Sequence, residues 1–391
     1  MNHLLHTIRR ELHRAVDSPR YLLLMTLGIA FSYLFFLTLM QEGQPEELPV
    51  AVVDHDGSYL SRRLCHELNA TQGVRVVAVY PTHAEARKAM QRQEIFAFLE
   101  IPEQTYSEML DFKTPHVALY SNNAFLLAGS LSYKTLATMG KLASAAVQRE
   151  VLRKKGLPDE KIMGLIQPVE FDTHLVSNPT ANYQPYVLTT ILPGIVALMV
   201  LLFTAYEVSR EQKERSAQAW LASANGNLLC ALAGKLLPYT FWFSLLGVVG
   251  NIIFFGPCRY TMLGSFWLLV LAVVLLVLAA QAMGVFLSAL LSDMHMAVCL
   301  CAIYGALSFS MSGFSYPVTS MPAPLQACSN LFPLRHYYMI YAKTALYGCG
   351  WSQCWPHVCA LLLFVLAGLM GALLMARQMR REYKGEEGLA V

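Results

Sequence analysis

The chain has 391 residues and a formal net charge of +3, with 29 Lys and Arg against 26 Asp and Glu. Charged residues make up only 14% of it, against roughly 25% in soluble domains, and hydrophobic residues make up 55%. This composition favours a membrane protein, and so small a net charge gives no support to a nucleic-acid partner.

The first 40 residues predict an amphipathic helix followed by a membrane span. Apolar residues recur at helical spacing from Leu4 to Val16, with basic residues on the other positions. This pattern predicts a cytoplasmic elbow helix within residues 1–20 that lies flat on the bilayer, with a plain cytosolic helix as the alternative. The apolar run at 21–40 is long enough to cross the membrane and to remain as an anchor.

Residues 41–186 predict an inserted α/β domain, because short strand-like runs alternate with helix-like segments. The turn Asp54-His55-Asp56-Gly57 follows the first strand. It reads as a solvated turn, since it lacks the remaining positions of a calcium loop. We expect strands at 49–53, 74–79, 95–101, 117–120 and 169–175, and helices at 58–69, 82–91, 103–110 and 126–155.

Five further apolar runs in residues 187–376 bring the expected membrane spans to six. They lie at 187–206, 228–255, 266–291, 297–314 and 357–376. Lys and Arg flank the first span, follow the second and enrich the tail at 377–391. Because short basic loops mark the cytoplasmic side, both termini are predicted inside and residues 41–186 outside.

The segment 207–222 after the second span begins charged and becomes amphipathic. Deeper in the spans lie two polar side chains, Lys235, which is expected to snorkel toward the inner headgroups, and Gln281. No phosphate-binding loop, zinc spacing or recognisable catalytic grouping occurs, so no catalytic, cofactor or metal residue is assigned. If the chain moves a solute, its energy therefore arrives from elsewhere, and 207–222 is where we expect it to enter.

Residues 321–346 are apolar but interrupted by proline, and neither half is long enough to cross a bilayer. They predict a re-entrant or interfacial segment on the outer side, which would form an outer gate. The candidate residues of the gate are Pro317, just before this segment, and Pro322, Pro333, Arg335 and Tyr337 within it. Cys349 and Cys354 on the same side are candidates for a disulfide.

The whole chain resembles the membrane subunit of type-2 ABC transporters, in particular those with a large extracytoplasmic domain between the first two spans. The resemblance is carried by the elbow helix, by Val50 to Asp54 and Ser58 to Leu64, by the charged segment after the second span, and most specifically by Ser312 to Pro317 and Asn330 to Tyr337. Ser216-Ala217 and Gln218 depart from the family's coupling pattern.

This resemblance implies an exporter-like permease in a bacterial inner membrane. ATP and Mg²⁺ would bind to separate ABC ATP-binding subunits, and a second copy or a paralogous permease, with a possible periplasmic membrane-fusion adaptor, would complete the complex. The residues expected to contact the ATPase or to couple to it are Glu207, Glu211, Glu214, Arg215, Gln218 and Trp220.

The apolar spans favour a hydrophobic or amphipathic substrate. Two other classes stay open: a membrane receptor or envelope scaffold whose outer domain binds a partner, and a secondary carrier. The second is disfavoured because the span interiors lack Asp and Glu.

Overall fold

A computed structural model describes residues 2–17, 19–111, 113–167, 172, 174, 176–178, 182–214, 216–291 and 293–389. The chain divides into two compact units. The helical unit comprises Met1–Gln41 and Leu175–Val391, and the α/β unit comprises Glu42–His174. The inserted domain predicted at 41–186 is therefore shorter at its carboxyl end, because the residues from 175 onward belong to the helical unit.

Among the described residues, six helices of the helical unit are long and apolar enough to cross a membrane, and their order agrees with the six predicted spans. The third coincides with the predicted range, whereas the second and sixth continue well beyond the apolar runs. These helices are α2 (Arg20–Leu39), α8 (Tyr183–Lys213), α10 (Leu228–Phe255), α11 (Phe266–Ser288), α12 (Met294–Met311) and α15 (Trp351–Leu389).

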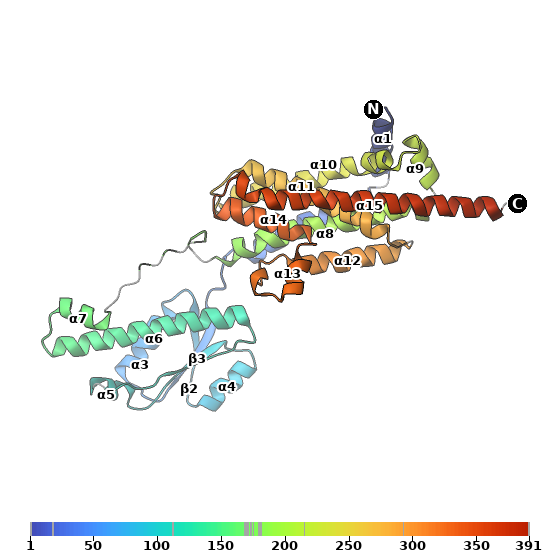
Figure 1. The fold of residues 1–391 in the computed structure, drawn as a ribbon. Helices are drawn as coiled ribbons and strands as arrows, with labels where there is room; N and C mark the ends of the chain where they lie inside the picture. Colours follow the sequence, from blue (N-terminus) through green and yellow to red (C-terminus); the bar gives the residue numbers. More distant parts are fainter. Residues whose placement is uncertain are drawn as a thin grey trace. The chain divides into compact units, whose positions relative to one another are not determined.

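Helix α11 forms the centre of the helical unit. It packs against α8, α10 and α15, and 78% of its most apolar window is buried, against 11% for α2. Helix α12 also packs against α11, whereas α2 packs against α8. The short α1 (Asn2–Asp17) and α9 (Ala217–Ser223) meet at one end of the bundle (Figure 1). The core thus lies along α11.

The proline-rich segment between the fifth and sixth spans is broken into short helices, as predicted. They are η1 (Val318–Ser320), α13 (Ala323–Ser329), α14 (Pro333–Tyr341) and the π-helical η2 (Ala342–Leu346). Pro333 occupies the first turn of α14, where a missing N–H costs nothing. Helix α14 packs against α11 and α15, and this contact covers its irregular ends.

The α/β unit is a mixed four-stranded sheet with the order β2-β1-β3-β4. Its strands are β1 (Leu48–Asp54), β2 (Val74–Tyr80), β3 (Ala97–Ile101) and β4 (Ala118–Ser121), and its helices are α3 (Tyr59–Asn69), α4 (His83–Gln91), α5 (Thr105–Leu110), α6 (Leu126–Lys154) and α7 (Asp159–Ile166). Strand β1 is parallel to β2 and β3, and β4 is antiparallel to β3.

Both faces of this sheet are covered by helices. Val50 and Val52 of β1 join the core beneath α3 and α6, whereas Ala51 and Val53 join the core beneath α4. This alternation follows from the two-residue period of a strand. The strand–helix alternation was predicted and α7 was not. Of the strand expected at 169–175, only residues 172 and 174 are among the described residues.

Candidate functional site

Helix α8 continues for two turns past its apolar run, and there the helix and the residue directly after it carry four charged side chains on one face. Glu207, Arg210, Glu211 and Glu214 are spaced three and four residues apart, which brings them together on a helix. Arg210 Nε donates to Glu214 Oε1 over 2.6 Å and its Nη1 lies 3.7 Å from Glu207 Oε1. Glu211, between them, points into the protein and is fully buried.

Lys235 of α10 provides the cation that this buried carboxylate needs. Its side chain is 0% exposed, and Nζ donates to Glu211 Oε1 over 2.9 Å. The same Nζ lies 3.4 Å from Glu207 Oε2 at ion-pair distance, although without hydrogen-bond geometry. Lys235 therefore does not snorkel toward headgroups as predicted, because carboxylates inside the protein already neutralise it.

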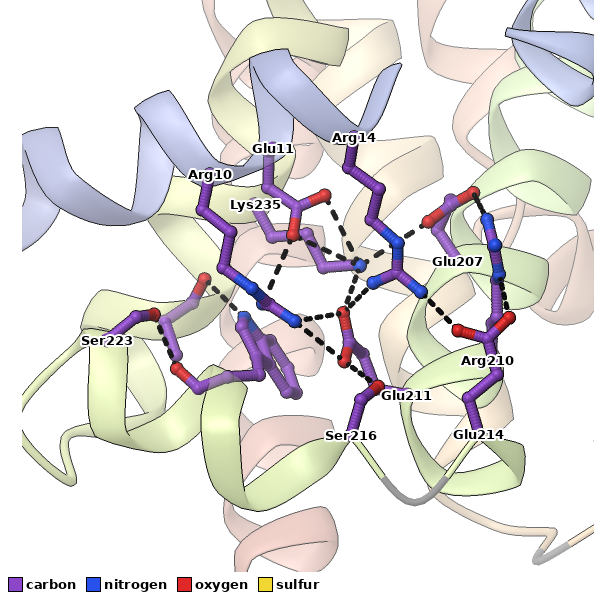
Figure 2. Close-up of polar contacts among 12 residues, drawn as sticks. Arg10, Glu11, Arg14, Glu207, Arg210, Glu211, Glu214, Ser216, Ser223 and Lys235 are labelled. Atoms are coloured by element: carbon purple, nitrogen blue, oxygen red, sulfur yellow. Dashed lines mark hydrogen bonds and ion pairs between the residues drawn. The ribbon is translucent and has the colours of Figure 1, made fainter. Parts of the chain in front are cut away.

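Helix α1 contributes the remaining partners. Glu11 is fully buried, and its carboxylate oxygens lie 3.4 and 3.5 Å from Lys235 Nζ. Arg14 donates from Nη1 to Glu211 and from Nη2 to Glu214 Oε2, the latter over 2.6 Å. Arg10 Nη2 donates to Glu211 Oε2 over 3.3 Å. Figure 2 shows these side chains converging from three helices.

Helix α9 closes the same region. Trp220 is fully buried, donates from Nε1 to the Ala231 carbonyl over 3.3 Å, and lies with its ring 5.7 Å from Lys235 Nζ, within cation–π range. Ser216 Oγ donates to Glu211 Oε2 over 2.5 Å, and the Ser223 hydroxyl lies 3.3 Å from that of Thr7. Helix α9 is thus tied to α1, α8 and α10.

Helices α1 and α10 approach closely at one glycine. A Cβ added at Gly234 would lie 2.6 Å from Thr7 Cβ. This distance is too short for two carbon atoms that are not bonded to each other. The absence of a side chain at Gly234 therefore allows α1 to pack directly on α10, next to Lys235.

We call the eight ionisable residues the charge cluster. Its four basic and four acidic members balance within the described part of the chain, and they are Arg10, Glu11, Arg14, Glu207, Arg210, Glu211, Glu214 and Lys235. Buried ion pairs of this kind add little net stability, but removing one partner leaves an uncompensated charge that costs about 3–5 kcal/mol. The cluster therefore holds three helices in one arrangement.

Two carboxyls of the cluster lie outside the spans, and their pKa values shift in opposite directions. Burial raises the pKa of Glu11, although the nearby Lys235 opposes this. The hydrogen bond that Arg210 donates lowers the pKa of Glu214, whose side chain is 43% exposed. The cluster thus has a buried side at Glu11 and a surface side at Glu214.

The predicted coupling residues separate into a buried and an exposed group. Glu207, Glu211 and Trp220 are buried inside the chain, so their side chains hold the helices together, and their role in coupling to an ATPase stays a prediction. Glu214 and Gln218 are exposed and remain available to a partner. Arg215 lies outside the described residues.

Gln281 of α11 is a satisfied polar group between spans. It accepts a hydrogen bond from Thr240 Oγ1 over 2.7 Å, and its Nε2 donates to the Leu236 carbonyl over 3.4 Å. The side chain therefore joins α11 to α10.

The residues of the predicted outer gate differ in burial: Pro333 and Tyr337 are buried, Arg335 is half-buried, and Pro317 and Pro322 are exposed. Tyr337 is fully buried, with its hydroxyl 3.4 Å from Asn251 Oδ1, and Arg335 Nε donates to Asn330 Oδ1 over 3.2 Å. Pro317 and Pro322 directly precede η1 and α13. A gating role stays a prediction.

The predicted disulfide is absent from the structure, since Cys349 and Cys354 are free thiols. Cys354 is buried, and its Sγ lies 3.4 Å from Thr344 Oγ1. Among the described residues, no group of three or more His, Cys, Asp or Glu side chains is arranged to hold a metal ion.

Sequence reasoning missed the partners that α1 supplies. The apolar face of α1 is exposed on the surface of the chain, with Leu5 and Val16 more than half exposed. The polar face, which carries Thr7 and Glu11, is buried. Thr7 and Glu11 are four residues apart and so share a face. The signal available was Lys235, a cation in an apolar span that requires acidic partners.

Comparison with known proteins places these observations in a family. Residues 20–374 match the family described as ABC-2 family transporter protein. Two similar curated proteins, from Escherichia coli strain K12 and from Escherichia coli O157:H7, are each described as a probable multidrug ABC transporter permease, YbhR. Each is 21% identical over 353 residues, which cover 89% of this chain and 92% of the relative.

Proposed function

Because this chain belongs to the ABC-2 family of transporter proteins, we propose that it is the permease of an ATP-driven exporter for hydrophobic or amphipathic compounds. Membership of the family makes the chain a multi-pass membrane subunit without catalytic activity of its own, which works with ABC ATP-binding subunits. Export, substrate class and the route of coupling are the proposed part.

The charge cluster is the observation that carries this proposal. It joins α1, α8 and α10 through Lys235 and Glu211, and α9 through Ser216, at the end of the bundle where Glu214 and Gln218 are exposed. A push on the exposed residues would move the joined helices together, since a packed and fully paired group responds as one body. We propose that the ATP-binding subunits act there.

Two observations support a hydrophobic or amphipathic cargo. The relatives are described as probable multidrug permeases, and the six candidate spans are strongly apolar, with mean hydropathies from 1.6 to 2.7. The distribution of Lys and Arg supports an arrangement with both termini in the cytoplasm and the α/β unit outside. A second copy or a paralogous permease, and a periplasmic adaptor in double-membrane bacteria, would complete this assembly.

The test is to break the cluster from its exposed side and compare ATP hydrolysis with transport. In complexes reconstituted with the co-purified ATP-binding subunits, Arg14→Glu removes the bonds to Glu211 and Glu214. We expect the ethidium transported per ATP hydrolysed to fall by about tenfold, which corresponds to one charge-assisted hydrogen bond. Arg14→Glu combined with Glu214→Arg should recover part of it.

Arg149→Glu is the matched control, since Arg149 forms an exposed ion pair with Asp159 in the α/β unit. This variant should leave the ratio of transport to hydrolysis unchanged. An unchanged ratio in Arg14→Glu would contradict coupling through the cluster. Transport that stops when the ion gradient is collapsed at constant ATP would instead indicate a secondary carrier.

A further inference from the structure

The α/β unit contains a cavity of about 390 Å³ between the sheet and its covering helices α3 and α6. Small-molecule sites are typically about 300–1,000 Å³ in volume and mostly apolar. The floor of this cavity fits that description, because Leu99, Ile101 and Leu136 are buried there. Tyr133 and Lys141 stand exposed at its rim.

The cavity lies at the carboxyl ends of two neighbouring parallel strands. The chain leaves β1 through α3 toward β2 on one side, and after β3 it pairs with β4 on the other. Ligands of open α/β sheets bind at such a point, where the connections diverge. The two loops are joined where His55 N–H donates to the Ile101 carbonyl over 3.0 Å.

One polar group in the cavity wall lacks a partner. Asp56 Oδ1 lies 3.5 Å from the donating Tyr106 N–H, but Oδ2 is buried and has no hydrogen-bond partner among the described residues. A buried carboxylate oxygen without a donor costs free energy that a ligand donor can recover. Asp56 is also part of the cavity wall. The motif around it, which reads as a solvated turn, therefore contributes a carboxylate to a wall that is mostly apolar.

We propose that this cavity binds a hydrophobic amine, with the ammonium group donating to the Asp56 carboxylate and the hydrocarbon part lying on Leu99, Ile101 and Leu136. An ammonium supplies both the missing donor and the opposite charge, so it forms the stronger, charge-assisted bond. Lys141, the only basic residue of the wall among the described residues, is exposed at the rim, where water solvates it.

This inference does not depend on the proposed transport function, because the cavity is formed within Glu42–His174 alone. Binding can be measured without ATP or ATP-binding subunits. A failure of binding would thus leave the coupling experiment unaffected, and a failure of coupling would leave the cavity proposal standing.

The experiment uses the full chain in lipid nanodiscs and an octylamine analogue that carries a diazirine in its alkyl chain. After irradiation, mass spectrometry locates the labelled peptides, and competition with octylamine or octanol gives the selectivity. We expect labels in the segments 60–64 and 133–144, which line the cavity, and octylamine should compete at least about tenfold better than octanol.

Two variants and one control make the test specific. Asp56→Asn keeps the shape and should weaken labelling on the order of tenfold. Gly140→Phe should abolish it, because Gly140 lines the cavity and an added Cβ meets nothing within 4 Å. Gly164→Phe, at an equally open helical glycine outside the cavity wall, should label like the wild type.

Equal competition by octanol and octylamine, together with unchanged labelling in Asp56→Asn, would overturn the amine assignment. Labelling that persists in Gly140→Phe would overturn the site itself, since the probe would then be bound elsewhere. Should Gly140→Phe fail to fold, Asp56→Asn and the octanol competition still decide the proposal.

Discussion

The charge cluster and the cavity of the α/β unit both enclose carboxylates, but they satisfy them differently. Glu211 is fully buried and accepts hydrogen bonds from Lys235, Arg10, Arg14 and Ser216. Asp56 has one oxygen with no donor within the described structure. A saturated group of this kind holds helices in place, whereas an unsaturated one retains capacity for a ligand.

The largest expected difference in stability comes from removing one charge from the charge cluster and one from the cavity. Lys235→Met leaves Glu11, Glu207 and Glu211 facing one another without their buried cation, which should lower the free energy of unfolding by about 3–5 kcal/mol. Asp56→Asn should change the free energy of unfolding by less than about 1 kcal/mol, because no opposite charge is left without a partner when the Asp56 carboxylate is removed. Thermal unfolding of both variants in nanodiscs measures this contrast.

Lys213→Met is the control for Lys235→Met, since Lys213 lies exposed near the end of α8 and should matter by no more than about 0.5 kcal/mol. Adding Glu211→Gln to Lys235→Met should restore part of the loss. Equal effects of Lys235→Met and Lys213→Met would contradict the description of the cluster as a buried, mutually dependent group.

A smaller contrast follows from two helical glycines. Gly234→Ala places a Cβ 2.6 Å from Thr7 Cβ and should destabilise the chain by about 1–3 kcal/mol through overpacking. Gly140→Ala, in open space on α6, should stabilise it by about 0.5–1 kcal/mol, because alanine loses less backbone entropy in a helix.

Unfolding measurements on Gly234→Ala and Gly140→Ala compare the change in the free energy of unfolding in the two regions. Thr7→Gly should relieve Gly234→Ala specifically, as it removes the atom that clashes. The two glycine substitutions should change the free energy of unfolding in opposite directions. If Gly234→Ala stabilised the chain, α1 would not pack on α10 as described.

The smallest effect concerns pH. A carboxyl with a raised folded pKa stabilises the protein fully below its ordinary pKa of 4.5, and this contribution is lost as the pH rises through the folded value. Glu11→Gln should therefore flatten the loss of thermal stability of the wild type above pH 4.5. Glu214, whose pKa is lowered, should act oppositely, so Glu214→Gln should flatten the loss on acidification.

Much of the fold was predictable because it depends on local patterns. The apolar run of α10 set its bounds, and Ser58 and Thr82 cap α3 and α4 as their residue types indicate. The helical continuation of α8 to Lys213 was partly visible in its charged periodicity. Such features need no knowledge of distant residues.

The site was predictable only in part, because its partners are distant in the chain. The sequence marked Glu211 and Trp220, but not that both turn inward, since an amphipathic pattern does not say which neighbour a face meets. Glu11 as the partner of Lys235 could not be derived without the packing of α1 on α10. Asp56 read as solvated, because a cavity is formed by tertiary packing and not by the turn itself.

The ion pair between Glu11 and Lys235 joins residues that are 224 positions apart. At ribosomal speeds of about 5–20 residues per second, the N-terminal helix waits on the order of ten seconds or more before its partner emerges. Until then Glu11 needs water in place of Lys235, although Glu211 and Glu214 already offer partners to Arg10 and Arg14. A truncated product that stops before Leu228 would retain a helix whose Glu11 lacks Lys235, and cellular proteases could recognise it as an unfinished chain.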